Sequence, residues 1–397
     1  MKKSSNPRDP SDKVWKSFFL LGFSYGPMVY SMARTRLVEK LHLMKERDIT
    51  DGIAIGQVMP GAVFVDFVSY LGYLIGRTRG AFAAMLLFVT PSFLLMLILS
   101  FLYMKYGELH MIQNILRGLS AIMIALIVKV IIDIYKSGVK GFRYLIVAAV
   151  ATGLILLNVN IAVILGVGVA MTMTYGVFSK QLVMEKGGFR FPSIKDILDY
   201  IKSNFWVVWI IAGLIVVNTA IFFFAPSVAI MDVNLFKIGL LTFGNGYTML
   251  PFIYKEVVQT YHWLTPKEFS DGIVMGQITP GPVIITATFI GYKVAGIFGA
   301  LTATLSIFLP STILVSLVSK TFVKYKDSRW AEFALKGILA SFLGLLAVVV
   351  VQLGRTSITD YKTALFALVA VVLFLYTKIN PVLLLLAGVV VSMIVFR

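Results

Sequence analysis

The sequence TPGP at residues 279–282 interrupts a long apolar segment, with Gln277 just before it and Lys293 at the end of the segment. In the hydrocarbon of a bilayer, backbone N–H and C=O groups must be satisfied, so such a break is expected inside protein or beside a polar cavity. Thr279 could cap a helix that starts at Pro280, and the free N–H groups of a helix N-terminus bind anions. We therefore predict an anion site at this break; the alternative is a kink that serves packing alone.

Three further breaks carry similar residues. Gln57 stands one turn before Pro60-Gly61, and Gly26 and Gly246 mark two more interruptions. Glutamine offers a neutral hydrogen-bond donor to an oxygen-rich ligand, and glycine lets the backbone come close to it. The predicted substrate-binding residues are Gly26, Gln57, Pro60, Gly61, Asn245, Gly246, Gln277, Thr279, Pro280, Gly281 and Lys293.

Ionisable residues inside apolar segments are costly and are usually functional. Asp66 lies deep in its segment, where it could carry a proton or pair with Lys293 or Arg117. Glu256, at the edge of a segment, is a second candidate proton carrier. Lys293 could instead extend to the membrane interface. Arg117 and its repeat counterpart Lys336 could hold an anion or anchor their helices.

The composition indicates that a bilayer is the solvent of this chain. Of 397 residues, 58% are hydrophobic and 14% are charged, and the mean hydropathy is +0.88. Soluble domains average about 45–50% apolar and about 25% charged residues. The net charge of +17 is explained by basic loops on the cytoplasmic side of a membrane. Nucleic-acid binding is not expected, because no polar domain could host it.

Several kinds of chemistry are excluded or lack a signature. The chain has no cysteine, which excludes disulfides, thiolate catalysis and cysteine-ligated metals, and its three histidines are not spaced for a metal site. No P-loop, zinc-protease motif or serine–histidine arrangement is visible. We therefore predict no metal, no cofactor, no direct use of ATP and no enzyme activity.

Hydrophobic runs predict an all-α polytopic membrane protein with about 13 segments, some of them broken or re-entrant. Six segments precede a polar, basic linker and seven follow it. The segments are 14–33, 51–75, 80–103, 112–135, 142–157 and 160–178, then 204–225, 234–252, 271–295, 298–320, 333–353, 361–376 and 381–396.

The two sides of the linker are predicted to be homologous halves. DGIAIGQVMPG at residues 51–61 matches DGIVMGQITPG at residues 271–281. After a slip of one residue, Gly72-Tyr73, Gly80, Pro91-Ser92 and Arg117-Gly118 match Gly291-Tyr292, Gly299, Pro310-Ser311 and Lys336-Gly337. The predicted division is an N-terminal repeat (1–178), a cytoplasmic linker plus an extra transmembrane helix (179–232), and a C-terminal repeat (233–397).

The segment at 204–225 has no counterpart in the first half, so an odd number of spans precedes the second half. The halves are therefore predicted to form an inverted repeat, a common plan in transporters. Basic loops place the N-terminus in the cytoplasm. The basic stretch at residues 34–50 would then face outward if its neighbours span the membrane; either it is an exception, or the broken segments are re-entrant.

At these residues the chain resembles the chromate ion transporter family. The likeness is carried by FGNGYTMLPFIYKEVV, WLTPKEFSDGIVMGQITPGPVIITATFIGYKVAG and GALTATLSIFLPS in the second half, and by FSYGP, DGIAIGQVMPG and GAFAAMLLFVTPS in the first. Because it covers both halves, the chain is similar to the long, two-domain members. The resemblance implies an inner-membrane carrier that exports chromate, is driven by the proton motive force and interacts with sulfate. The first half departs from the family pattern at Ser24-Tyr25, where members have a glycine pair, and around Pro60-Gly61.

Together these observations predict a multi-pass secondary transporter of a tetrahedral oxyanion, chromate by resemblance, with the four breaks as its site. The alternatives are a carrier of sulfate or another oxyanion, including uptake, an anion channel, and a lipid-modifying membrane enzyme, for which we find no paired carboxylates. The expected partners are a small inorganic oxyanion and the lipid bilayer, with a homodimer as one option for assembly.

Overall fold

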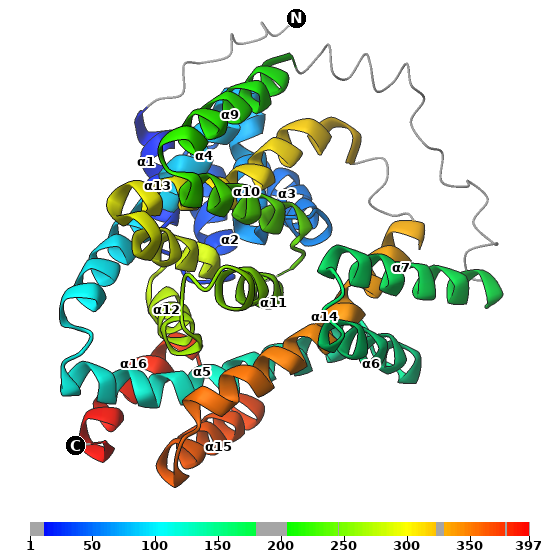
Figure 1. Ribbon diagram of the computed structural model, residues 1–397. Helices are drawn as coiled ribbons and strands as arrows, with labels where there is room; N and C mark the ends of the chain where they lie inside the picture. Colours follow the sequence, from blue (N-terminus) through cyan, green and yellow to red (C-terminus); the bar gives the residue numbers. More distant parts are fainter. Residues whose placement is uncertain (1–11, 180–204, 245, 323–328, 378, 397) are drawn as a thin grey trace, which may run out of the picture.

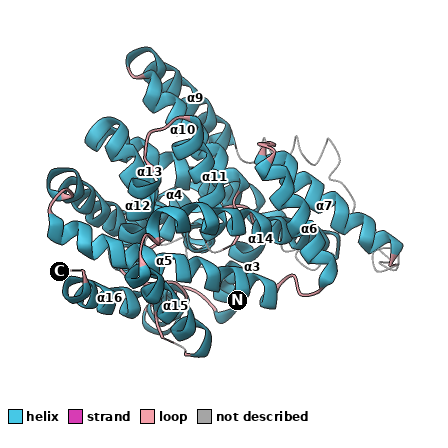
Figure 2. Ribbon diagram, turned by 60° about the horizontal axis from the view of Figure 1, so that its bottom comes forward, coloured by secondary structure: helices cyan, strands magenta, loops and turns pink. Residues whose placement is uncertain are grey.

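The computed structural model describes residues 12–179, 205–244, 246–322, 329–377 and 379–396. Every regular element in these ranges is a helix, and no strand occurs in them. The predicted all-α class is thereby confirmed for the part of the chain that is described. Figures 1 and 2 show the helices packed around one centre, with α6 and α7 projecting to one side.

The first half begins with short helical pieces and ends with longer helices. Its elements are α1 (Asp12–Leu21), α2 (Met28–Ala33), the π-helix η1 (Arg34–Lys40), α3 (Glu46–Val58), α4 (Val63–Tyr106), α5 (His110–Ser137), α6 (Phe142–Leu156) and α7 (Ile161–Phe178).

The second half repeats this order after one additional helix, α9 (Phe205–Phe224). Its elements are α10 (Pro226–Leu241), η2 (Tyr247–Met249), α11 (Leu250–Tyr254), the π-helix η3 (Lys255–Thr260), α12 (Pro266–Ile278), η4 (Val283–Ile285), α13 (Thr286–Phe322), α14 (Arg329–Ser357), α15 (Tyr361–Tyr376) and α16 (Pro381–Val395). The π-helices η1 and η3 occur at matching places in the two halves. Residues with positive φ angles also occur at matching places. The pairs are Gly26 and Gly246, His42 and His262, Gly61 and Gly281, and Arg77 and Gly296.

Helices α4 and α13 are each folded back on themselves. Non-helical backbone at Gly76-Arg77 and at Ala295-Gly296 divides each helix into two arms. Gly72 then packs on the backbone of Gly80, and a Cβ atom at either position would overlap the other residue's carbonyl oxygen. Gly291 and Gly299 make the same contact in α13. The matched glycines in the sequence therefore mark the tight approach of two helical arms.

The halves exchange partners instead of packing side by side. Helix α5 packs against α15 and α16, whereas its counterpart α14 packs against α6 and α7 (Figure 1). Helices α4 and α13 pack on each other in the centre. One continuous apolar core joins both halves, with Phe67, Phe289 and Phe342 among its fully buried side chains.

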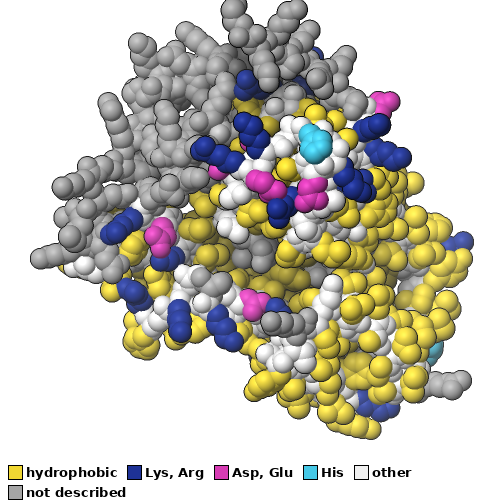
Figure 3. Space-filling model, turned by 180° about the vertical axis from the view of Figure 1, so that it is seen from behind, with side chains coloured by type: hydrophobic (Ala, Val, Ile, Leu, Met, Phe, Trp, Pro, Cys, Tyr) yellow, Lys and Arg dark blue, Asp and Glu magenta, His cyan; other side chains and the backbone are white. Residues whose placement is uncertain are grey.

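The surface and the helix lengths fit a membrane protein. Among the described residues, six helices are long and apolar enough to cross a bilayer. A space-filling view shows a broad hydrophobic flank, with charged side chains gathered apart from it (Figure 3). In contrast, α1, α3, α10 and α12 have 10, 13, 16 and 13 residues. A full span needs about 20 residues, so each piece is shorter than a span.

Candidate functional site

The break in the first half lies between α3 and α4 and is held by the second half. Helix α3 ends at Val58, Met59 is extended, and Gly61 has a φ of 139° that favours glycine. The N–H of Gly61 donates to the Thr242 carbonyl oxygen at 2.7 Å, and the N–H of Ala62 donates to Ser311 Oγ at 2.8 Å. Helix α4 starts at the next residue, Val63, so its N-terminus lies at this break.

The break in the second half is also held by the first half, here through backbone carbonyl oxygens that accept hydrogen bonds. Gly281 has a φ of 111°, and the hydroxyl of Ser92 donates to the Pro280 carbonyl oxygen at 2.7 Å. Tyr25 donates through its hydroxyl to the Ile278 carbonyl oxygen at 2.6 Å. Ser92 and Ser311 are repeat counterparts, so each break lies against the proline–serine turn of the other half. The breaks are thus buried in protein, as predicted for free backbone groups.

One detail of the predicted break is wrong. Thr279 does not cap the following helix: it ends α12, and its hydroxyl donates back to the Met275 carbonyl oxygen at 2.8 Å. A threonine hydroxyl commonly makes this bond to the residue four positions earlier. Pro280 is therefore not a first helical residue, and the next helical turn, η4, starts at Val283 with Pro282 before it.

The remaining glycines of the predicted site lie in the loops that end α1 and α10. Gly26 and Gly246 adopt left-handed conformations, with φ values of 50° and 79°. Gly246 packs near Val283 and Ile284 of η4, so this loop adjoins the second break. Asn245, also predicted as a site residue, lies outside the described residues.

The two glutamines have different surroundings. Gln277 is buried, and its Oε1 accepts a hydrogen bond of 2.7 Å from the hydroxyl of Tyr247. Its Nε2 is buried and has no hydrogen-bond partner among the described residues. Gln57 is exposed. Only Gln277 therefore offers a buried free donor beside a break.

Asp66 lies in the first turn of α4 and is fully buried. Neither of its carboxyl oxygens has a hydrogen-bond partner in the described ranges. A side chain at Gly61 would run into both the Asp66 carboxyl group and the Ser311 hydroxyl, so all three groups meet at the first break. An ionised carboxylate buried without a partner is costly, so Asp66 requires a proton or a hydrogen-bond donor to accompany it.

The suggested cationic partners of Asp66 are engaged elsewhere, which corrects that expectation. Lys293 pairs with Glu268 at 2.8 Å, at the start of α12. Burial raises the pKa of Glu268, but hydrogen bonds from Lys293 and Thr265 outweigh it and lower that pKa overall. From Glu268 to the break, α12 rises by about 16 Å, so Lys293 is not brought to the break.

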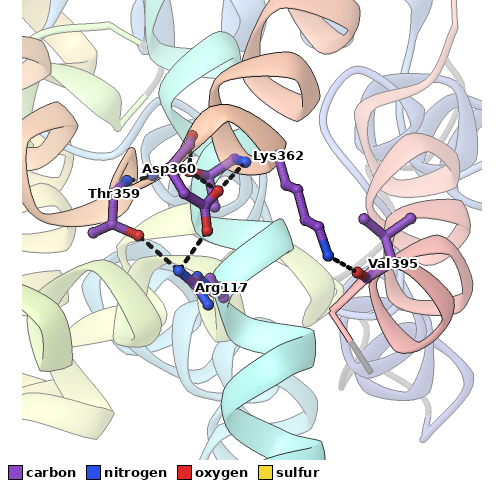
Figure 4. A network of polar contacts seen from close by, with 6 residues as sticks. Arg117, Thr359, Asp360, Lys362 and Val395 are labelled. Carbon is purple, nitrogen blue, oxygen red and sulfur yellow. Dashed lines mark hydrogen bonds and ion pairs between the residues drawn. The ribbon is translucent and has the colours of Figure 1, made fainter.

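Arg117 donates to Asp360 and to Thr359 Oγ1, which fastens α5 to the start of α15 (Figure 4). Hydrogen bonds from the α15 N-terminus lower the pKa of Asp360, and the Arg117 charge adds to this effect. Lys336 pairs with Glu332 on its own helix. Glu256 lies half-buried in η3.

Comparison with known proteins decides the family. The sequence profile described as "Chromate transporter" matches residues 13–173 and 229–393. The chain belongs to the chromate transporter family. It is 31% identical to the chromate transport protein of Cupriavidus metallidurans over 365 residues, which is 90% of this chain and 85% of that protein. No solved structure matches.

Two further relatives cover most of the chain. A probable chromate transport protein of Synechococcus elongatus is 29% identical over 358 residues, 89% of this chain and 86% of the relative. An uncharacterized transporter of Methanocaldococcus jannaschii is 28% identical over 398 residues, 100% of this chain and 96% of the relative. Membership of the chromate transporter family and the apolar helices together indicate a multi-pass membrane transporter.

Several residues that contact the breaks could not be recognised from the sequence of this member of the chromate transporter family. Ser92 and Ser311 were visible only as a matched pair, and Thr242, Tyr25 and Tyr247 carried no signal. Except for Tyr247, each of these residues contacts a position more than 150 residues away in the chain. No group of three metal-ligating side chains occurs in the ranges that the structure describes.

Proposed function

We propose that this protein is a secondary transporter that exports chromate, a tetrahedral oxyanion, through a site formed by the breaks. The observation that carries the proposal is the reciprocal burial of the two breaks, with the Gln277 amide and the Asp66 carboxyl group beside them and without partners in the described ranges. Secondary transporters place their sites where broken helices of two repeats meet. The names of the relatives supply chromate as the substrate.

The binding chemistry follows from the ends of the helices. The first N–H groups of α4, which begins at Val63, have no partners within the helix and carry partial positive charge. Each helix end offers about 0.3–2 kcal/mol to an anion, so several donors must converge on a dianion. The Gln277 amide would add a neutral donor, and Gln57, Pro60, Gly61, Gly246, Thr279, Pro280 and Gly281 would shape the site. Gly26, Asn245 and Lys293 remain in the proposal, Lys293 as a residue that acts only if its pair with Glu268 opens.

The membrane potential can drive the export of a dianion. Moving one negative charge outward across 100 mV, negative inside, releases about 2.3 kcal/mol, and a dianion releases about twice that. We propose Asp66, with Glu256 as the second candidate, as the residue that carries the proton during transport. A proton on Asp66 removes a negative charge beside the break and thus favours binding of the oxyanion. The same proton returns inward on Asp66 with the emptied site, so that the potential component of the proton motive force drives export.

The proposal includes the topology. The two halves form an inverted repeat of about 13 segments in the inner membrane, with a cytoplasmic N-terminus and re-entrant broken segments. The short lengths of α1, α3, α10 and α12 support re-entry. We also propose that the N-terminal repeat ends at residue 178, that the C-terminal repeat begins after residue 232, and that the protein assembles as a homodimer.

Flux in inverted membrane vesicles tests the proposal. Labelled chromate should accumulate inside such vesicles when an inside-positive potential is imposed, and a proton gradient should alter the rate. Labelled sulfate tests the alternative substrate in the same preparation. Accumulation against a gradient separates a carrier from a channel. Chromate uptake equal to that of vesicles without the protein would reject the proposed function.

A further inference from the structure

A basic pocket lies where α5, α6 and α14 meet, at one end of the helices. This cavity of about 430 Å³ is lined by Lys136, Lys140, Arg143 and Lys336, with Glu332 as its one carboxylate. Glu332 pairs with Lys336. Lys136, Lys140 and Arg143 make no ion pair with any described residue. The pocket therefore carries an excess of positive charge that favours an anion.

Arg143 is held in place with part of its guanidinium group unused. The group stacks over the ring of Tyr175, 4.1 Å from its centroid, and lies 5.2 Å from that of Tyr144. Its Nη1 atom is buried and has no hydrogen-bond partner in the described part of the chain. Leaving such a donor unsatisfied is costly. A planar guanidinium fixed by aromatic rings is suited to bind phosphate through two parallel hydrogen bonds.

The internal repeat provides a comparison. The counterpart of this pocket in the other half is the polar network of Figure 4, where Arg117 donates to the carboxylate of Asp360, the N-cap of α15. At the matching places the pocket has Lys336 for Arg117 and Gly141 for Asp360. Gly141 is the N-cap of α6 and provides no side-chain cap. The Arg117 network thus has a carboxylate at the N-cap of α15, whereas the pocket has none at the N-cap of α6; its one carboxylate is Glu332 of α14, which stands at the place of Gln113.

Two further matches extend the comparison. Lys140 stands at the place of Thr359, so an acceptor is replaced by another cation. Arg143 stands at the place of Lys362, which donates to the Val395 carbonyl oxygen of α16 at 2.9 Å. Compared with the Arg117 network, the pocket lacks the acceptors Asp360 and Thr359, has one carboxylate in Glu332, and has a cation at each of the places of Arg117, Thr359 and Lys362, which leaves it with excess positive charge. This difference indicates that the anion comes from outside the chain.

An apolar cavity adjoins the basic pocket and identifies the kind of anion. It has a volume of about 150 Å³ and shares Arg143 and Tyr144 with the basic pocket. Its other lining residues are Ile146, Val147, Met171, Thr172, Tyr175 and Phe333. Ile146 and Tyr175 are exposed on the outer face of α6 and α7, where lipid would lie. A charged head and an apolar body are thus accommodated side by side.

We propose that this pocket binds the phosphate group of an anionic phospholipid, with an acyl chain along α6 and α7. Basic pockets between transmembrane helices recognise such head groups. The ligand would join α5 and α14 to α6 as Asp360 joins α5 to α15. The inference does not depend on the transported substrate.

The test uses the full-length protein purified in a zwitterionic detergent. Phosphatidylglycerol, phosphatidylcholine or inorganic phosphate is added, and the thermal midpoint and the number of retained lipids are measured, the latter by native mass spectrometry. We expect phosphatidylglycerol to raise the midpoint and to stay bound, and phosphatidylcholine and inorganic phosphate to do neither. An equal shift with inorganic phosphate would overturn the lipid assignment in favour of a free anion, and no shift with phosphatidylglycerol would overturn the site.

Variants locate the binding. Lys140→Gln combined with Arg143→Gln should weaken phosphatidylglycerol binding by about tenfold or more, since each basic residue near an anionic head group contributes about 1 kcal/mol. Lys140→Glu leaves the stacked Arg143 intact and should also reduce binding. Lys105→Gln, which removes an exposed cation outside the pocket, is the control. Binding that is unchanged in both pocket variants, or reduced equally in the control, would refute the assignment.

Discussion

Gln277 and Gln57 hold matching sequence positions, but only one of them has the surroundings of a ligand-binding group. Tyr247 fixes the oxygen of Gln277, and this leaves the amide nitrogen as a buried donor at the second break. Gln57 faces outward from α3. The two halves therefore differ at this position, and in the proposed site Gln277 would provide the polar contact that Gln57 does not.

Replacing Gln277 by alanine should weaken chromate binding. A hydrogen bond to a charged group contributes about 1.5–3 kcal/mol, so the apparent affinity in vesicle uptake should fall by at least about tenfold. Gln57→Ala should have a smaller effect, and Gln113→Ala, at an exposed position in α5, should have none. Uptake with an unchanged affinity in the Gln277 variant would remove this residue from the site.

The position of the Asp66 carboxyl group beside the first break leads to a prediction of how transport depends on pH. The carboxyl group lies beside Gly61 and Ser311, where its negative charge would oppose a dianion. Chromate affinity should therefore rise as the pH falls and Asp66 takes up a proton. The Asp66→Asn variant carries a neutral amide at every pH, so it should keep affinity high while losing this dependence. Uptake is measured at several pH values, with correction for the protonation of chromate itself. A pH profile that is identical in both proteins would exclude Asp66 as the proton carrier.

At the scale of elements, each break depends on a contact that its own half cannot make. The proline–serine turns of α4 and α13 lie against the opposite breaks, and glycine is required because the approach is close. A Cβ atom at Gly281 would overlap Ser92 Oγ, and the φ of 111° would strain any other residue.

Gly281→Ala should lower stability and transport together. Backbone strain of this kind costs about 1–3 kcal/mol, and the overlap with Ser92 adds to it. The thermal midpoint in detergent should fall by several degrees. Adding Ser92→Gly should recover part of the loss, because the overlap is relieved while the strain persists. Gly153→Ala, in α6 with open space around it, is the matched control. A midpoint that matches this control would show that the break tolerates a side chain.

The sequence was sufficient to predict the elements whose signals are local. Glycine and proline spacing located all four breaks and the repeat, and the predicted boundary between segments 142–157 and 160–178 agrees with the turn between α6 and α7, where Asn160 caps α7. The fold-back within α4 lies at Gly76-Arg77, in the gap between the predicted segments 51–75 and 80–103, although Arg77 itself gives no local sign of a left-handed conformation. Thr279 was assigned to the wrong helix, since a threonine can cap the next helix or bond to the preceding turn.

Contacts between elements could not be predicted from the sequence, because they depend on how helices that are distant in the chain pack together. Lys293 is in the same apolar segment as the break, but the first arm of α13 carries it away from the break to the start of α12, where it pairs with Glu268. Arg117 had two equally reasonable roles until Asp360 was found next to it. Burial of Asp66 was inferred correctly from segment depth, whereas its neighbours Gly61 and Ser311 come from separate elements.

At the scale of the whole molecule, the halves are too closely joined to act alone. The bonds from Gly61 to Thr242, from Ala62 to Ser311 and from Ser92 to Pro280 all cross between halves. Helices α5 and α14 each pack on the last two helices of the opposite half. The proposed site therefore exists only when both halves are present.

Cutting the chain between α7 and α9 tests this dependence. Because no covalent link is needed for the contacts across the halves, the two fragments expressed together should assemble, copurify and transport chromate. Either fragment alone should give uptake no higher than vesicles without the protein, since its break would lack the serine and carbonyl partners from the other half. The measurements are copurification through a tag on one fragment and labelled chromate uptake.

Combining Ser311→Ala in the second fragment with an intact first fragment should weaken transport, because the N–H of Ala62 then loses its hydrogen-bond acceptor. Full transport by the first fragment alone would show that one break is sufficient and that the site is not shared.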